Sequence, residues 1–399
     1  MRIGMMVDRY KPYVSGITNY ISLNKQQLEL AGHQVFVFTF GDEDYEDKED
    51  NIIRTGGLPI VDTGYYLNYR YTTQARKLLQ TMDIVHVHHP FLSGSIGLRI
   101  CRPRNIPVVF TNHTRYDLYA HAYLPILPDV ISETMLHAYM PTFCRACDKV
   151  ISPSAGMKDI LLRLGVDVPV EIIPNGVDIK PFLVKDDACD RAELGFNSDD
   201  MILIYVGRLG PEKNMPFLLR SFAGIAQAYE RARLLIVGDG PEKDNMEDRV
   251  QAMGIQEKVV FTGMVPYEQL PGYLHISDAF VTASVTEVHP LSVIEAMAAG
   301  LPVLGIKSPG VGDTVQDGVT GFLSTEDLAA FTAKMVRMVT ENDLRRQMGN
   351  NAQEASHKYA IEKTTLAMIE LYQETITIAR SRKRPLRSKV SLFLEDLFT

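Results

Sequence analysis

The sequence predicts an α/β protein with two domains, each built around a parallel sheet. Short apolar runs rich in β-branched and aromatic residues alternate with helix-length amphipathic segments along the whole chain. That alternation is typical of repeated strand–helix–strand units. The strand-like runs form two series with a turn-rich segment between them, and a length of 399 residues with 46% apolar side chains fits two or three globular domains.

The first series contains six predicted strands. They cover Ile3–Val7, Gln34–Phe40, Asp83–His88, Val108–His113, Lys149–Pro153 and Glu171–Ile173. Each run has the length and the β-branched or aromatic content of a buried strand. The segment from Ile173 to Phe182 contains Pro-Asn-Gly and predicts a linker. We therefore expect a first domain at residues 1–176.

The second series contains five predicted strands. They cover Met201–Val206, Arg233–Val237, Lys258–Gly263, Ala279–Val285 and Pro302–Ile306. A last helical pattern, from about Ile361 to Arg380, has no strand after it. We expect a second domain at residues 177–358, with a separate helix and basic tail at residues 359–399.

Composition excludes several classes of protein. The net charge of −8 argues against general nucleic-acid binding. Four cysteines are too few for a disulfide framework, and Cys144-x-x-Cys147 lacks the second pair of ligands that a structural zinc site needs. No stretch reaches the roughly 18 consecutive apolar residues of a membrane span. We expect a cytoplasmic protein, and a peripheral contact with the inner face of the membrane stays open.

Residues 286–302 are the most informative segment for function. Glu287 and Glu295 lie on either side of a strand-to-helix junction, with Pro290 suited to the first helical position. The helix is predicted to end before Gly300 and Pro302. Its N-terminus offers free N–H groups to an anion, so it could hold phosphates while a carboxylate holds sugar hydroxyls.

A pair of cations follows the first strand of the second series. Arg208 comes after Gly207, and Lys213 lies five residues later. Arginine can bind a diphosphate as a two-pronged donor and lysine as a point charge. Taken alone, the pattern is more typical of an exposed charged turn.

Strand ends in the first half carry further candidates. Gly16 opens a helix, where backbone amides can approach a phosphate closely. His113 ends the strand that begins at Val108, where it could bond a sugar hydroxyl or a phosphate. The histidines at 86, 88 and 89 have no acidic partner at metal-ligand spacing, so we interpret them as residues of the core and of the cleft lining. The acidic run from Asp42 to Asp50 is interpreted as a solvated loop and not as a metal site.

One resemblance joins these motifs. The segment from Glu287 onward resembles the nucleotide-sugar site of the retaining glycosyltransferases of family 4. It consists of Glu287, seven residues, Glu295 and then Ala-Met-Ala-Ala-Gly-Leu-Pro. That family has the GT-B fold, in which two Rossmann-like domains face a central cleft and a C-terminal helix crosses back to the first domain. The resemblance covers nearly the whole chain. It implies a retaining hexosyltransferase that needs no metal and no cofactor beyond its nucleotide-sugar co-substrate.

The resemblance also implies a role for each candidate. Arg208 and Lys213 would hold the diphosphate, Glu287 the donor sugar and Glu295 the ribose. His113 completes the expected catalytic set. The expected donor-binding positions also include Gly16, Gly207, Val265, Leu291 and Ser292. Two positions depart from the family: Ser15 replaces the first glycine of a pair, and Pro290 replaces a glycine, which leaves the N–H groups of Leu291 and Ser292 for the phosphates.

The acceptor is suggested by a second similarity. The segment from His113 to Tyr119 is similar to diacylglycerol glucosyltransferases, and the Tyr- and Leu-rich residues 123–127 could line a lipid-facing mouth. We expect glucose transfer from UDP-glucose to 1,2-diacylglycerol. The alternatives are mannosyl or glucosyl transfer to phosphatidylinositol or to a soluble acceptor, a nucleotide-sugar epimerase, and a non-catalytic binding protein. The basic tail at 380–399 could bind an anionic membrane surface, or it could be a solvated end of the chain.

Overall fold

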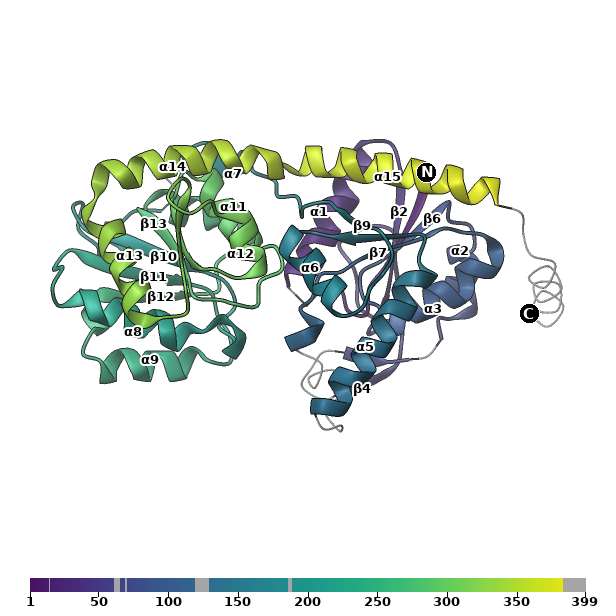
Figure 1. The fold of residues 1–399 in the computed structure, drawn as a ribbon, viewed down its shortest axis with the longest axis horizontal. Helices are drawn as coiled ribbons and strands as arrows, with labels where there is room; N and C mark the ends of the chain where they lie inside the picture. The colour runs from purple at the N-terminus through teal and green to yellow at the C-terminus, as the bar shows by residue number, and fades with distance from the viewer. Residues whose placement is uncertain (14, 61–64, 69, 119–128, 186–188, 383–399) are drawn as a thin grey trace. The chain divides into compact units, whose positions relative to one another are not determined.

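The computed structural model describes residues 1–399 except 14, 61–64, 69, 119–128, 186–188 and 383–399 (Figure 1). The chain divides into two units. Unit 1 comprises Met1–Gly176 together with the chain from Ile361 onward, and unit 2 comprises Val177–Ala360. Each unit contains a parallel sheet with helices packed against it (Figure 1), so the predicted fold class is confirmed.

Unit 1 contains a seven-stranded sheet in the order β3-β2-β1-β6-β7-β8-β9. Every neighbouring pair is parallel. The strands are β1 (Arg2–Met6), β2 (Gln34–Phe40), β3 (Ile52–Thr55), β6 (Ile84–Val87), β7 (Val108–Thr111), β8 (Lys149–Ser152) and β9 (Val170–Ile172). All six predicted strands form. The antiparallel ribbon of β4 (Leu58–Ile60) and β5 (Tyr65–Leu67) was not predicted, and neither was β3, because Gly, Pro, Asn and Asp interrupt this part of the chain and indicate turns.

The helices of unit 1 connect and cover these strands. They are α1 (Gly16–Leu30), α2 (Thr73–Leu79), α3 (Leu92–Cys101), η1 (Arg102–Arg104), α5 (Asp129–Ala146), α6 (Ala155–Arg163) and α15 (Ile361–Ser381). The start of α1 is fixed by a capping box, in which Ser15 and Thr18 bond each other's backbone N–H groups. None of the described helices is long and apolar enough to cross a membrane.

The last helix, α15, packs on unit 1. Its apolar face, with Met368 and Leu371, joins the core that contains strand β1. Tyr372 reaches the middle of the sheet, where its hydroxyl lies 2.6 Å from Nδ1 of His86, and the other nitrogen of that ring lies 2.7 Å from Thr111 Oγ1. The helix lies beside α1 (Figure 1). A buried polar chain therefore fixes the position of α15 on the sheet.

Unit 2 contains a six-stranded parallel sheet in the order β12-β11-β10-β13-β14-β15. Its strands are β10 (Met201–Val206), β11 (Ala232–Val237), β12 (Val259–Gly263), β13 (Ala279–Thr282), β14 (Val303–Ile306) and β15 (Gly321–Ser324). All five predicted strands form, although β13 ends at Thr282 and not at Val285. The four-residue β15 was not predicted, because Gly318 and Gly321 indicate a turn at this point of the chain.

The helices of unit 2 are mostly short. They are α7 (Lys180–Leu183), α8 (Met215–Ala226), α9 (Lys243–Ala252), α10 (Leu270–His275), α11 (Leu291–Ala298), α12 (Pro309–Thr314), α13 (Leu328–Thr340) and α14 (Asn342–Ser356). Single 3-10 turns are η2 (Ala192–Leu194), η3 (Pro211–Lys213), η4 (Gln256–Lys258), η5 (Tyr267–Gln269) and η6 (His357–Tyr359). The core lies between the sheet and these helices.

Both sheets have a point at which the strand order reverses. In unit 1, β1 lies between β2 and β6, and in unit 2, β10 lies between β11 and β13. Ligands of open α/β sheets bind beyond the carboxyl ends of the strands at such a point. The connections that follow β10 and β13 are therefore the first place to look for a site in unit 2.

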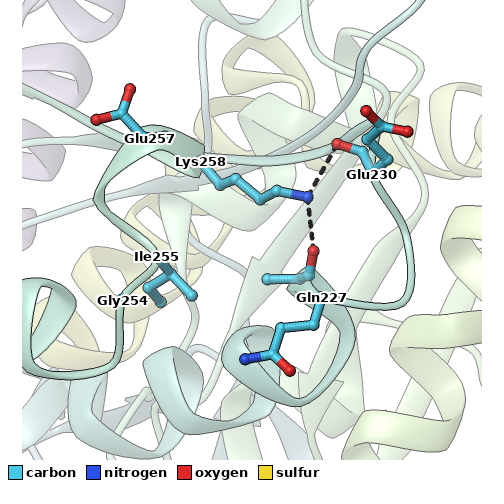
Figure 2. A pocket seen from close by; sticks show the side chains of 7 residues that line it. Gln227, Glu230, Gly254, Ile255, Glu257 and Lys258 are labelled. Atoms are coloured by element: carbon cyan, nitrogen blue, oxygen red, sulfur yellow. Dashed lines mark hydrogen bonds between the residues drawn. The ribbon is translucent and has the colours of Figure 1, made fainter.

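A pocket at the opposite edge of the second sheet has a structural explanation (Figure 2). It lies where β11 and β12 begin, and it includes Gln227, Glu230 and Lys258. The Lys258 ammonium donates to the carbonyl oxygens of Ala226 at 2.6 Å, Tyr229 at 3.2 Å and Glu230 at 2.9 Å. A cation there satisfies carbonyl groups at the end of α8, so this lysine is a helix cap.

Glycine positions give a test of the packing in unit 1. A Cβ built on Gly94 would lie 2.4 Å from the carbonyl oxygen of His89, whereas one built on Gly16 meets nothing within 4 Å. We expect Gly94→Ala to lower the free energy of unfolding by about 1–3 kcal/mol, since overpacking forces backbone shifts. Gly16→Ala should leave it unchanged or slightly raised. Urea unfolding followed by circular dichroism measures both, and equal stability of the two variants would contradict this packing.

Candidate active site

An ion pair joins the two connections at the carboxyl edge of β10 and β13. Nζ of Lys213, at the end of η3, lies 2.7 Å from Oε1 of Glu287, in the loop between β13 and α11. Both side chains are about four-fifths buried. Burial alone would raise the pKa of Glu287, but the Lys213 ammonium outweighs it and the pKa is lowered. Burial opposes the charge on Lys213 as well, yet Glu287 raises its pKa. Both groups are therefore ionised at neutral pH.

The backbone around this pair is held by close contacts. The N–H of Gly310 donates to the carbonyl oxygen of Glu287 at 3.0 Å. A Cβ on Gly310 would lie 2.5 Å from that oxygen, so only glycine allows this approach. Thr286 Oγ1 donates to the carbonyl oxygen of Glu212 at 3.4 Å and links the two connections a second time. Glu287 is thus presented by a loop with little freedom to move.

Arg208 lies on the same edge and is less constrained. Its side chain is 53% exposed, and Nη1 lies 3.8 Å from Oε1 of Glu212, which is a loose pair. The turn beneath it is tight, because a Cβ on Gly238 would lie 2.0 Å from the carbonyl oxygen of Gly207. The guanidinium therefore stands on a fixed turn with its charge accessible to a ligand.

Glu295 has an environment opposite to that of Glu287. It lies on α11, it is only 6% exposed, and its Oε1 accepts a hydrogen bond from the hydroxyl of Tyr267 at 2.9 Å. Burial raises the pKa of Glu295 to about 7, although the bond from Tyr267 opposes that rise. A carboxyl that titrates near neutral pH is typical of a functional site.

The N-terminus of α11 lies between the two carboxylates. The sequence analysis placed Pro290 at the first helical position, and this was wrong: Pro290 is the N-cap, with an extended ψ of 111°, and the helix begins at Leu291. Its side chain makes no capping hydrogen bond. The first-turn N–H groups, including those of Leu291 and Ser292, have no partner inside the helix. The proline therefore removes none of the helical donors that could hold a phosphate.

Unit 1 contributes a chain of neutral imidazoles at the end of β6 and β7. Nε2 of His113 lies 3.1 Å from Nδ1 of His88, and the ring of Tyr20 lies 4.7 Å from that of His113. Burial lowers the pKa of His88 and of His113 well below the usual range. His86 and His88 are fully buried core residues, as interpreted from the sequence, and His113 is half-buried. Within the described part of the chain, no group of three His, Cys, Asp or Glu side chains has an arrangement that could hold a metal ion.

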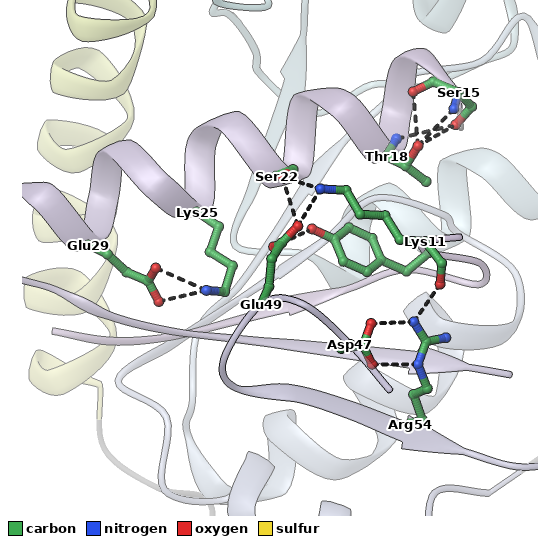
Figure 3. Close-up of polar contacts among 10 residues, drawn as sticks. Lys11, Ser15, Thr18, Ser22, Lys25, Glu29, Asp47, Glu49 and Arg54 are labelled. Carbon is green, nitrogen blue, oxygen red and sulfur yellow. Dashed lines mark hydrogen bonds and ion pairs between the residues drawn. The ribbon is translucent and has the colours of Figure 1, made fainter. Parts of the chain in front are cut away.

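The loop before Gly16 is held by the acidic run (Figure 3). Glu49 accepts hydrogen bonds from the hydroxyls of Tyr10 at 2.9 Å and Ser22 at 3.0 Å, and also from the ammonium of Lys11. Asp47 accepts two from Arg54, at 2.6 and 2.7 Å. Interpreting the whole run as a solvated loop was therefore wrong for Asp47 and Glu49. Lys11 is 38 positions from Glu49, so spacing alone could not show that pairing, whereas Arg54 is only seven positions from Asp47.

The predicted site residues follow the carboxyl ends of strands in both units. Unit 2 brings together the residues at the ends of β10, β12 and β13: Gly207, Arg208, Lys213, Val265, Glu287, Leu291, Ser292 and Glu295. Unit 1 holds Gly16 at the start of α1 and His113 after β7. The sequence analysis missed Tyr267 and Gly310. Tyr267 follows Val265 by two residues, which was the one available signal, but its contact with Glu295 spans 28 positions.

Comparisons with known proteins agree with this arrangement. Residues 14–180 match the family described as Glycosyltransferase Family 4, and residues 186–355 match Glycosyl transferases group 1. The α-monoglucosyldiacylglycerol synthase of Streptococcus pneumoniae is 32% identical, over 81% of this chain and 75% of its own. The enzyme of the same name from Acholeplasma laidlawii is 29% identical, over 94% and 98%.

The fold also matches a solved structure. HepE of Anabaena, in complex with UDP and glucose, has a TM-score of 0.75 at 19% identity, covering 94% of this chain and 100% of that one. This likeness concerns the fold. This likeness in fold, the two family matches and the 32% sequence identity together establish the family of the chain. The protein belongs to the family 4 glycosyltransferases and is a hexosyltransferase with the GT-B fold.

Proposed function

We propose that this enzyme transfers a hexose from a nucleoside diphosphate sugar to a lipid alcohol, with retention of anomeric configuration and without a metal. The observation that carries the proposal is the pairing of Lys213 with Glu287 beside the uncapped N-terminus of α11. UDP-glucose and 1,2-diacylglycerol are the proposed substrates. The names of the two bacterial relatives support the acceptor, and the UDP and glucose bound to HepE support the donor.

The leaving group explains the need for these cations. When the bond between C1 of the sugar and the phosphate oxygen breaks, negative charge develops on the β-phosphate. Arg208, Lys213 and the first N–H groups of α11 would stabilise that charge more in the transition state than in the ground state. Because these groups sit on tight turns, little reorganisation is needed when the charge forms.

The carboxylates fit binding roles. Glu287 is held as a carboxylate by Lys213, so it can accept hydrogen bonds from sugar hydroxyls but is a poor covalent nucleophile. We propose a front-face reaction, in which the bond from C1 to the acceptor oxygen forms on the side from which the phosphate leaves. The acceptor proton passes to the departing phosphate. Glu295 would accept hydrogen bonds from the ribose, and the backbone at Val265 would contact the base. Neutral His113 would bond a sugar hydroxyl. Gly16 would leave space for a phosphate.

Membrane association is part of the proposal. Arg380 and Arg382, at the start of the basic tail, pair with Asp83 and Asp148 of unit 1. The remaining basic residues of the tail, at 383, 384, 387 and 389, lie outside the described residues. We propose that they bind anionic lipid headgroups, since a basic residue near such a surface contributes about 1 kcal/mol.

A transfer assay tests the function. The full chain is incubated with UDP-glucose and vesicles that contain 1,2-diacylglycerol, with and without EDTA. We expect UDP and an α-linked glucosyl diacylglycerol, identified by the anomeric coupling in NMR, at rates unaffected by EDTA and higher on anionic than on zwitterionic vesicles. A β-linked product or inhibition by EDTA contradicts the mechanism, and epimerised donor without acceptor identifies an epimerase.

Arg208 gives the cleaner test of leaving-group stabilisation. Lys213→Ala would leave Glu287 buried without its cation and lower stability as well as activity. Arg208→Ala should lower kcat by roughly a hundredfold, as expected for removing a donor to the developing charge, with an unchanged Tm.

The matched control for that variant is Arg231→Ala. Arg231 is 70% exposed and pairs with Asp199 at 3.0 Å, at the amino edge of the same sheet. This control should keep its kcat. Near-normal turnover of Arg208→Ala, measured with saturating donor, would remove Arg208 from the mechanism.

A further inference from the structure

We propose that Tyr267 covers Glu295 in the ligand-free enzyme and is displaced when the ribose of the donor binds, so that this tyrosine sets the affinity for the nucleotide. The inference rests on the proposed function and deepens it. In the structure, the hydroxyl of Tyr267 lies 2.9 Å from Oε1 of Glu295. A hydroxyl at this position is the chemical equivalent of one ribose hydroxyl.

Access to Glu295 requires that this cover opens. Glu295 is 6% exposed on α11, whereas Tyr267 is 40% exposed at the start of η5. A ligand that bonds the Glu295 carboxylate at Oε1 would therefore compete with the phenol for this nearly buried oxygen. A single hydrogen bond at the surface of unit 2 thus holds Tyr267 over Glu295 in the ligand-free enzyme.

The cover can open without disturbing the core. Residues 266–269 are all exposed, and the ring of Tyr267 meets Phe182 edge-on, with 6.1 Å between ring centroids. Rotation of the side chain away from Glu295 therefore loses little apolar contact. By contrast, Glu295 lies on a helix whose residues Val293, Ile294 and Met297 are packed in the core, so the tyrosine is the partner that moves.

Exchange of the phenol for a ribose is chemically favourable. A buried carboxylate needs hydrogen-bond donors, and the phenol supplies one, whereas a ribose diol supplies two. The pKa of Glu295 remains raised to about 7 in spite of the phenol, which shows that one donor does not compensate for burial. A bound nucleotide would thus give the Glu295 carboxylate two hydrogen-bond donors, whereas Tyr267 gives it one.

The place of Tyr267 in the chain also fits this role. It follows Val265, the proposed base contact, by two residues, and it bonds Glu295, the proposed ribose contact. The phenol thus belongs to a residue two positions from the proposed base contact and bonds the proposed ribose contact. A nucleoside that bonds both would lie close to this side chain.

The test compares nucleotide binding by the wild type and by Tyr267→Phe, which keeps the ring and removes the hydroxyl. Isothermal titration with UDP at pH 8.5, above the pKa of Glu295, should give about tenfold tighter binding by the variant, because its carboxylate starts without that donor. With 2′,3′-dideoxy-UDP, which lacks the diol, the gain should vanish. Weaker binding of UDP would mean that the hydroxyl contacts the bound nucleotide, and unchanged binding would mean that it only packs. Either result overturns the inference.

Two controls make the comparison specific. Tyr273→Phe removes a hydroxyl from the half-buried tyrosine of α10 and should leave the affinity unchanged. In a Glu295→Gln background, Tyr267→Phe should no longer tighten binding, since coupled residues show their interaction in a double-mutant cycle. A wild-type chain that binds none of UDP, GDP and ADP would contradict the proposed function itself, whereas one that prefers another base changes only the nucleotide used in this comparison.

Discussion

The ion pair between Lys213 and Glu287 is the interaction on which the site in unit 2 depends. It joins the connection after β10 to the connection after β13, at the point where the strand order of the sheet reverses. Burial removes water from both charges, and their mutual attraction offsets this desolvation free energy only when the geometry is good. Such a pair is weak evidence for stability as such. Its value here is that it fixes a carboxylate in the charged state beside a helix N-terminus.

The two glutamates show how one residue type acquires two properties. Lys213 lowers the pKa of Glu287 against the effect of burial, whereas burial raises that of Glu295 to about 7. The consequences for stability have opposite signs. The contribution of Glu287 is present above its unfolded pKa and is lost as pH falls through its folded value. That of Glu295 is present below its ordinary pKa of 4.5 and is lost as pH rises through 7. At neutral pH, ionisation of Glu295 is therefore opposed by burial, and hydrogen bonds from a bound ribose would offset that cost.

The sequence predicted the framework well because its signals are local. The eleven predicted strands are runs of β-branched and aromatic residues, and parallel topology then places their polar ends at one edge. What it missed depends on contacts between distant segments or on very short elements. The pairing of Glu49 with Lys11 and the bond from Tyr267 to Glu295 join residues 38 and 28 positions apart. The strands β3, β4, β5 and β15 have three or four residues each. They lie in segments rich in Gly, Pro, Asn and Asp, which indicate turns and not strands.

We infer that the carboxyl edge of β10, β12 and β13 binds a nucleoside diphosphate. Hydrogen–deuterium exchange of the full chain, with and without saturating UDP, tests it most directly, because a ligand that binds the native state suppresses local opening. We expect protection at residues 207–214, 263–268 and 286–296 and no change around the pocket of Lys258. Protection confined to other segments, or none with UDP bound, would contradict it.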